Sequence, residues 1–332
     1  MVAFGSDAGL ILRSIRQYSA KLGRESKITP DLSVNPVATA AYGVSTPSAS
    51  FQPDRFESVN KIGQGDIVEL APGIICEALV GKHNNAVELY TAIVTFGKGD
   101  TVLPLHTHPH SESITLISGT ACVEVEDRRY ILKPLDNITI PPGYVHNVKN
   151  ISMDSSAIFH IAMPTVFPHR DQAEILNVVY VVYKEVPNDF SGHAGPERVT
   201  RHLSARRYPS GPNTEFIDFF NDNLIPGIGM SGGYGLFYKD GRLPAHLHDF
   251  DESICIVGGE AICLVEGRQY IMSDLTTALQ PRGRVHYFTN HLPTYVNDLG
   301  VCRAYASANG GFRELCSFTE AWPVVRSKID NP

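Results

Sequence analysis

Short segments in which apolar and polar side chains alternate recur along most of the chain. Two clear examples are CVEVEDRRYIL at residues 122–132 and ICLVEGRQYIM at residues 262–272. A period of two, together with many Val, Ile and Tyr residues, predicts half-buried β-strands. Turn-forming pairs such as Ser118-Gly119 separate these segments. Many short strands at this spacing predict an all-β fold, either a sandwich, a jelly roll or a barrel.

The pattern occurs twice in the sequence. The segment from Leu103 to Asn150 aligns without a gap to the segment from Leu243 to Asn290, at a constant offset of 140 residues. Apolar, glycine, charged and histidine positions all coincide in this alignment. An internal repeat of this length predicts two domains that share one architecture.

The chain divides into four predicted parts. These are an N-terminal helix and arm, a first barrel, a bridging strand with a linker, and a second barrel, at residues 1–58, 59–165, 166–215 and 216–322. Ile11 and Ile15 lie at helical spacing within residues 6–22, which predicts an amphipathic helix there. An organelle transit peptide is the alternative, although Asp7 and Glu25 do not suit such an acid-poor segment.

Composition restricts the function classes. The chain has 332 residues, of which 43% are hydrophobic and 19% charged, as is typical of soluble globular proteins with two domains. A formal net charge of −7 gives no reason to expect a nucleic-acid partner, and no apolar run reaches the roughly 18 residues that span a membrane. The six scattered cysteines form no Cys-x-x-Cys pair, which indicates reduced thiols. We therefore expect a cytoplasmic protein with neither nucleic-acid nor membrane partners.

Each repeat carries four residues of the types that bind transition metals. His106 and His108 are two residues apart, so a strand would place both imidazoles on one face. Glu112 follows at an even separation, and His146 comes from a later strand. The second repeat has the same set at His246, His248, Glu252 and His286.

This donor set predicts one divalent transition metal in each domain. Three neutral imidazoles and one carboxylate suit Fe, Mn, Co, Ni, Cu or Zn, among which the sequence does not choose. Four protein ligands on an octahedral ion leave two positions open, which is a catalytic arrangement and not a closed structural one. A single His-x-His pair would be a weak indication, but the complete set in both repeats favours metal binding.

The spacing of these residues resembles the two signature motifs of the cupin superfamily. The pattern His-x-His-x3-Glu-x6-Gly is followed in each repeat by Pro-x-Gly-x2-His-x3-Asn, at residues 106–119 and 141–150, and again at 246–259 and 281–290. The glycine that usually precedes the histidines is displaced by one residue in both copies. The resemblance implies two tandem cupin barrels (double-stranded β-helix or jelly-roll barrels), each with its metal in the mouth.

Tandem cupins, or bicupins, with this ligand set include quercetin-type dioxygenases and oxalate decarboxylases, so the resemblance leaves the reaction open. Oxalate decarboxylases carry an arginine three residues before the first histidine, where this chain has Leu103 and Leu243. A leucine cannot pair with a carboxylate, so oxalate suits this chain poorly.

We hypothesise a dioxygenase that acts on a small enol, diketone or phenolic substrate. A divalent ion with three neutral ligands and one carboxylate keeps one net positive charge, which favours an enolate or phenolate as an added ligand. The first alternative is a non-redox metal-dependent lyase or isomerase. The second is a small-molecule-binding cupin without catalysis.

Further roles are hypotheses at the level of single residues. Glu112 or Glu252 could leave the metal and act as a general base, which would require a raised pKa. Tyr144, Arg282 and Arg284 lie in the loops before the last ligands and are candidates for substrate binding, although solvated loop residues are the alternative. Because many cupins dimerise, a homodimer is also possible.

Overall fold

The computed structural model describes residues 52–168, 171–172, 182–248, 250–273, 275–290 and 296–302, with the backbone alone at 171–172 and 296–302. These residues form strands, with one short 3-10 helix, η1 (Lys82–Asn84). The predicted all-β class is therefore confirmed. The helix predicted over residues 6–22 lies outside the described residues.

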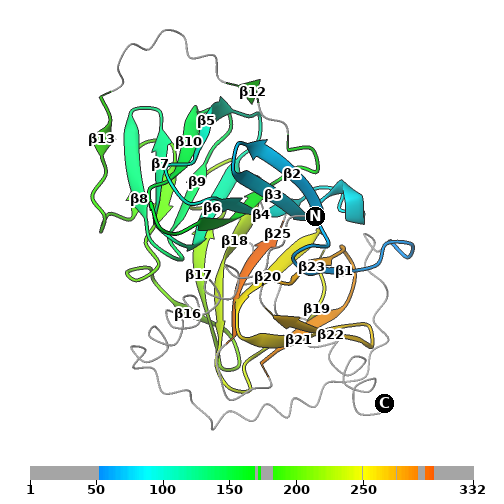
Figure 1. Cartoon of the computed structure of the whole chain (residues 1–332). Coiled ribbons are helices and arrows are strands. Elements are labelled where there is room, and N and C mark those ends of the chain that lie inside the picture. Colours follow the sequence, from blue (N-terminus) through cyan, green and yellow to red (C-terminus); the bar gives the residue numbers. More distant parts are fainter. Residues whose placement is uncertain are drawn as a thin grey trace.

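The first barrel consists of two facing sheets (Figure 1). Its strands are β2 (Asp66–Ala71), β3 (Ile74–Val80), β4 (Tyr90–Phe96), β5 (Val102–Thr107), β6 (Glu112–Ser118), β7 (Ala121–Val125), β8 (Arg128–Leu132), β9 (Asn137–Ile140), β10 (His146–Asn150), β11 (Ala157–Met163), β12 (Asp171–Gln172), β13 (Lys184–Glu185), β14 (Gly192–His193) and β15 (Arg198–Thr200). One sheet has the order β14-β15-β9-β6-β11-β4-β3-β2, and the other β12-β5-β10-β7-β8-β13.

The second barrel repeats this arrangement. Its strands are β1 (Ser58–Asn60), β16 (Tyr208–Gly211), β17 (Thr214–Phe220), β18 (Ser231–Phe237), β19 (Arg242–His246), β20 (Glu252–Gly258), β21 (Glu260–Val265), β22 (Arg268–Ser273), β23 (Thr277–Gln280), β24 (His286–Thr289) and β25 (Val296–Cys302). The sheet orders are β1-β23-β20-β25-β18-β17-β16 and β19-β24-β21-β22. Two tandem jelly-roll barrels, as predicted, make up the described part of the chain.

The two barrels exchange their first strands. Strand β1 precedes the first barrel but pairs with β23 of the second, with Val59 opposite Ala278. Strand β15 precedes the second barrel but pairs with β9 of the first, with Val199 opposite Ile138. The offset of 140 residues holds for both members of these pairs. The sequence analysis began the first barrel at residue 59, whereas residues 58–60 belong to a sheet of the second barrel.

A buried carboxylate anchors each exchanged strand. Glu197, which precedes β15, accepts hydrogen bonds from Nε and a terminal nitrogen of Arg128, at 2.6 and 3.0 Å, and from the Tyr130 hydroxyl. The second barrel repeats the arrangement 140 residues away, where Glu57 accepts hydrogen bonds from Arg268 and from the Tyr270 hydroxyl. Carboxylates paired with a guanidinium and a hydroxyl in this way satisfy a charge that would otherwise be costly to bury.

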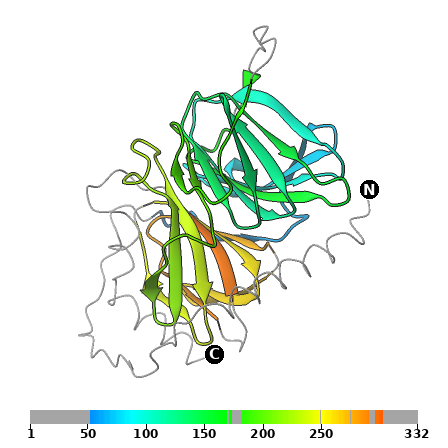
Figure 2. The same ribbon diagram turned by 90° about the vertical axis from the view of Figure 1, so that its left-hand side faces the viewer.

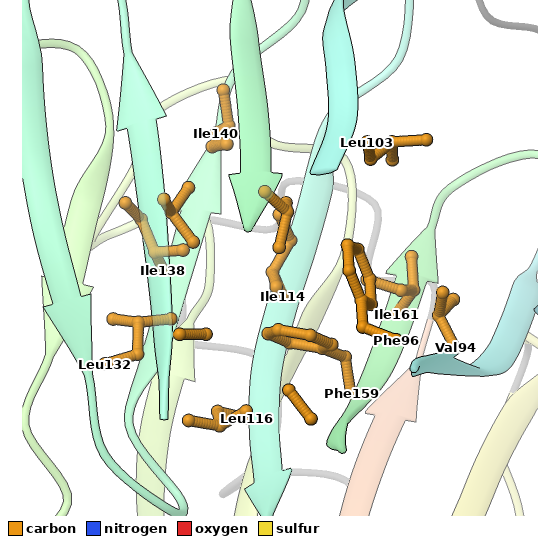
Figure 3. Packing of buried hydrophobic residues seen from close by; sticks show 14 of the residues in the cluster. Val94, Phe96, Leu103, Ile114, Leu116, Leu132, Ile138, Ile140, Phe159 and Ile161 are labelled. Carbon is orange, nitrogen blue, oxygen red and sulfur yellow. The ribbon is translucent and has the colours of Figure 1, made fainter. Parts of the chain in front are cut away.

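Apolar side chains fill the first barrel between its two sheets. Figure 3 shows Ile114, Ile138, Ile140 and Phe159 turned toward a common interior. In each strand these residues alternate with side chains that face the other way, as the period-two pattern predicts. The metal ligands described below are attached to the same strands, so the core fixes their positions.

A second apolar cluster joins the barrels. It combines Leu79, Ile93 and Ile158 of the first barrel with residues of the second such as Phe219 and Tyr234. The hydroxyl groups of Thr91 and Ser253 also lie 2.9 Å apart across this contact. The barrels therefore lie directly against each other, the blue-to-green one above the yellow-to-orange one in Figures 1 and 2.

Candidate metal centres

The first centre forms where three strands of the first barrel meet. His106 lies near the end of β5 and Glu112 begins β6, while His146 begins β10 directly opposite His106 in the ladder. His108 follows β5 in the connecting turn. All four side chains are buried, and one ligand atom from each lies within 4.8 Å of the others.

Backbone hydrogen bonds orient the three imidazoles of this centre. Nδ1 of His106, His108 and His146 lies 2.9, 2.5 and 2.9 Å from the carbonyl oxygens of Pro104, His110 and Tyr144. A carbonyl oxygen can only accept, so each Nδ1 carries the proton and each Nε2 presents a lone pair in the neutral ring. Such bonds are the usual support of metal-ligating histidines.

The four donors converge in a way that suits a cation. Oε2 of Glu112 lies 3.2 Å from Nε2 of His108 and 3.0 Å from Nε2 of His146. In the neutral rings these are lone-pair acceptors that face a carboxylate oxygen, so they require a positive charge between them. A divalent metal bound by these residues fits that requirement.

The second centre has the same construction. Oε2 of Glu252 lies 3.3 Å from Nε2 of His248 and 3.0 Å from Nε2 of His286. His246 completes the set, and one ligand atom from each of the four residues again lies within 4.8 Å of the others. The Nδ1 atoms contact the carbonyl oxygens of Pro244, Phe250 and Arg284 at 2.7, 2.7 and 2.9 Å. The prediction of one metal site in each domain is thus confirmed.

Both glutamates are held in their ionised form. Burial alone raises the pKa of Glu112, but the contacts with His108 and His146 outweigh burial and place that pKa well below its usual value. The same opposing effects lower the pKa of Glu252. In the same centre, burial and the neighbouring His286 lower the pKa of His246 to about 3, so its imidazole is neutral at ordinary pH.

These directions bear on the general-base hypothesis for Glu112 and Glu252, which requires a raised pKa. The structure shows the opposite shift, because each carboxylate faces two histidines. This arrangement favours the role of anionic metal ligand. A catalytic role for either glutamate stays a prediction.

The three predicted substrate-binding residues lie in the loops at the two mouths. Tyr144 is partly exposed, at 36%. Arg284 is buried and donates hydrogen bonds to Glu266 and to the carbonyl oxygens of Arg55 and Pro53. Their proposed roles in substrate binding stay predictions.

Arg282 contacts carboxylates beside the second centre. Its guanidinium lies 2.6 Å from Glu88, and its backbone N–H donates to Asp251. Because the printed partners of Arg282 and Arg284 are protein groups, both arginines help to hold the segment around residues 52–56 and the loops together at this mouth.

Sequence reasoning missed the ion pair between Arg55 and Asp251. The two guanidinium nitrogens of Arg55 lie 3.0 and 2.6 Å from the carboxylate of Asp251, which directly precedes the ligand Glu252. Asp251 is completely buried, and the matching residue of the first barrel is Ser111. The charge difference between these aligned positions was a usable signal for Asp251. Nothing in the sequence pointed to Arg55, which is 196 residues away.

The comparisons with known proteins agree with this geometry. Residues 92–162 match the sequence family described as Cupin domain. No curated protein matches the chain. Within its described residues, the chain has no helix with the length and apolar character needed to cross a bilayer.

Solved structures resemble most of the chain. An oxalate decarboxylase from Lactobacillus farciminis, in a formate complex, has a TM-score of 0.58 and 15% identity over 78% of this chain and 89% of its own. A mutant oxalate decarboxylase from Bacillus subtilis has a TM-score of 0.59 and 15% identity, covering 75% and 78% of the two chains. AerE from Microcystis aeruginosa has a TM-score of 0.53 and 12% identity, covering 73% and 97%. At such identities the likeness shows the fold.

Two jelly-roll barrels, each with a three-histidine, one-glutamate centre, define a metal-binding double-stranded β-helix protein. Together with the family match in the first barrel, they place the chain in the cupin superfamily as a bicupin. These findings support a metal-dependent bicupin enzyme and leave its reaction to be argued from the sites.

Proposed function

We propose that this bicupin is a metal-dependent dioxygenase that cleaves a carbon–carbon bond in a small enol, diketone or phenolic substrate. The observation that carries the proposal is the apolar character of the barrel wall near the ligands. Leu103 and Leu243, three residues before the first histidine of each centre, are buried in the apolar cores of their barrels. Such a wall suits an apolar or phenolic substrate and offers no cation at that position to a dicarboxylate.

The residues of the chain have defined parts in this reaction. A bound divalent metal would supply a Lewis-acidic position for an enolate or phenolate oxygen and, if it is redox-active, electrons for dioxygen. Glu112 and Glu252 supply negative charge to that position, and the backbone carbonyls fix the imidazoles. Apolar side chains such as Leu103 pack against the substrate and exclude water, which strengthens the electrostatic interactions inside.

A non-redox lyase or isomerase is the second candidate. It is favoured by the similarity in fold to structures named as oxalate decarboxylases. The leucines at positions 103 and 243 speak against oxalate itself, but not against decarboxylation or isomerisation of a more apolar substrate. Consumption of dioxygen separates this candidate from the dioxygenase.

A binding protein without catalysis is the remaining alternative. It would bind the same small molecules but would turn none of them over. We also propose a cytoplasmic location, since the four described cysteines are buried thiols. A homodimer stays a proposal that light scattering on the purified chain would test.

The first experiment identifies the metal and the use of oxygen. The protein is purified without added metal, its metals are measured by inductively coupled plasma mass spectrometry, and oxygen uptake is followed with a panel of diketones and phenols. A redox-active metal near two equivalents per chain, with substrate-dependent uptake, is expected. Zinc, or a redox metal without uptake, would move the assignment to lyase or isomerase chemistry. Failure to bind metal even after reconstitution would leave a binding protein.

Single-ligand variants test the assignment of the two centres. His106→Ala and His246→Ala are each expected to reduce the metal content by about one equivalent per chain, since each removes one ligand of one centre only. Comparison of oxygen uptake by the two variants then shows which centre turns substrate over. If both variants retained a full metal complement, the ligand assignment would be wrong.

A further inference from the structure

The interiors of the two barrels differ at one position beside the metal ligands. In the first barrel Ile140 is the cross-strand partner of Glu112, and in the second barrel Gln280 is the cross-strand partner of Glu252. Directly paired residues of antiparallel strands project from the same face of the sheet. Gln280 therefore lies on the interior wall that also carries the metal ligand Glu252.

Two observations place the Gln280 amide in the barrel interior. Ala278, two residues earlier on the same strand, belongs to the apolar core of the second barrel. The amide Nε2 donates to Sγ of Cys263, another residue of that core, at 3.2 Å. The residue that matches Cys263 in the first barrel is Val123, so the polar pair exists in the second barrel alone.

The other end of this amide has no protein partner. Gln280 is completely buried, and no hydrogen bond to its Oε1 is found among the residues that the structure describes. A buried amide oxygen without a hydrogen-bond donor is destabilising, and native proteins rarely retain one without a reason. Ile140, which fills the same position in the first barrel, shows that an apolar side chain is compatible with this architecture.

We propose that Gln280 determines ligand specificity at the second centre, where its Oε1 accepts a hydrogen bond from a hydroxyl group of the metal-bound ligand. The second centre would then take an α-hydroxy-carbonyl compound, which coordinates through two oxygens and keeps a proton on one of them. The first centre, with Ile140 at that position, would not distinguish the hydroxyl from its methyl ether in this way. This inference rests on the proposed function, because it assigns a substrate class to one of the proposed centres.

The test uses two ligands that differ in this proton alone among their polar groups. Glycolate has the α-hydroxyl, and methoxyacetate replaces its hydrogen with a methyl group. His106→Ala protein retains the second centre and His246→Ala protein the first. Each is loaded with Co(II), and the visible absorption of the metal reports ligand binding under argon, without any turnover.

We expect the ratio of the two dissociation constants to favour glycolate roughly five- to tenfold more at the second centre than at the first, as one added hydrogen bond would give. Measuring both ligands at both centres corrects for the size of the methyl group. Gln280→Ile in the second-centre protein should lower the ratio to that of the first centre. The reciprocal Ile140→Gln variant of the first-centre protein should raise it.

Equal ratios at the two centres, or an unchanged ratio in Gln280→Ile, would overturn the proposal. Thermal unfolding of the metal-free Gln280→Ile protein provides a readout other than ligand binding. A specificity residue leaves the melting temperature equal or higher, because the unsatisfied amide is gone. A lower melting temperature with an unchanged ratio would instead mark Gln280 as structural. If that variant does not fold, the comparison between the two unaltered interiors decides.

The same data separate this inference from the proposed function. A protein that shows the glycolate preference but consumes no oxygen would contradict the dioxygenase and support the role of Gln280. A protein that consumes oxygen but shows no such preference would support the dioxygenase and overturn the role of Gln280.

Discussion

His160 is a histidine buried where the two barrels meet. It lies on β11 between Ile158 and Ala162, which belong to the apolar cluster that joins the barrels. Its Nε2 has no hydrogen-bond partner among the residues that the structure describes. Burial lowers the pKa of His160 to about 4, because this site cannot solvate an imidazolium ion.

This pKa predicts that the protein loses stability as the pH falls from about 6.5 to about 4. Over this range the unfolded chain binds a proton on His160 and the folded chain does not, so protonation favours unfolding. The shift corresponds to about 3 kcal/mol at its full extent. His160→Gln should flatten the pH dependence of the free energy of unfolding, measured with urea on metal-free protein.

The exposed residue His83 provides the control for this prediction, since His83→Gln should leave the pH dependence unchanged. Some dependence should remain in the His160 variant. Burial and the neighbouring Arg207 lower the pKa of His202 to about 3, and this shift acts with the same sign. An identical slope in wild type and His160→Gln would show that His160 is not responsible.

At the scale of the elements, the exchanged strands depend on their buried glutamates. Glu197 is completely buried with Arg128 and Tyr130, so removing its charge leaves the guanidinium without its main partner. We expect Glu197→Gln to reduce the free energy of unfolding by about 3–5 kcal/mol, as for other broken buried ion pairs. Urea unfolding followed by circular dichroism measures this loss.

Asp127→Asn is the matched control, because Asp127 also contacts Arg128 but its side chain is 41% exposed. Exposed pairs contribute only about 0–1 kcal/mol. Losses of similar size in Glu197→Gln and Asp127→Asn would show that burial of the pair does not matter. Glu57→Gln should behave like Glu197→Gln, since the two anchors correspond in the repeat.

At the scale of the whole molecule, the two barrels share an apolar contact. Phe219 belongs to the cluster that joins them and is 1% exposed. Phe219→Ala should destabilise the protein by about 3–5 kcal/mol, because it removes a large buried side chain and leaves a cavity. The barrels should still unfold in one transition in the wild type, which calorimetry and urea unfolding can show.

Met153→Ala is the control at this scale, since Met153 is 71% exposed. Its effect should stay within about 0.5 kcal/mol. Two separate transitions in the wild-type protein would contradict the view that the contact couples the barrels.

Much of the fold and of both centres was accessible from the sequence. Alternation of apolar residues predicted the strands, and the repeat predicted two equivalent barrels. The ligand sets were predictable because His-x-His on a strand places both rings on one face, and because the same four residues recur 140 positions later. These features depend on local geometry, which a sequence pattern expresses directly.

The remaining features depend on contacts between distant segments. The strand exchange was not visible, because β1 and β15 are only three residues long and pair with strands far away in the sequence. Nor did Ile140 and Gln280 stand out as a difference at the metal centres until the register with Glu112 and Glu252 was known.

The sequence by itself thus determined the class of fold, the duplication and the eight ligands, because periodicity and residue type act within a strand. Only the tertiary structure decided which strand completes which barrel, the direction of the glutamate pKa shifts and the polar wall of the second centre. Each of these is a property of groups that folding brings together, and their burial, their charges and their unmet hydrogen bonds arise only there.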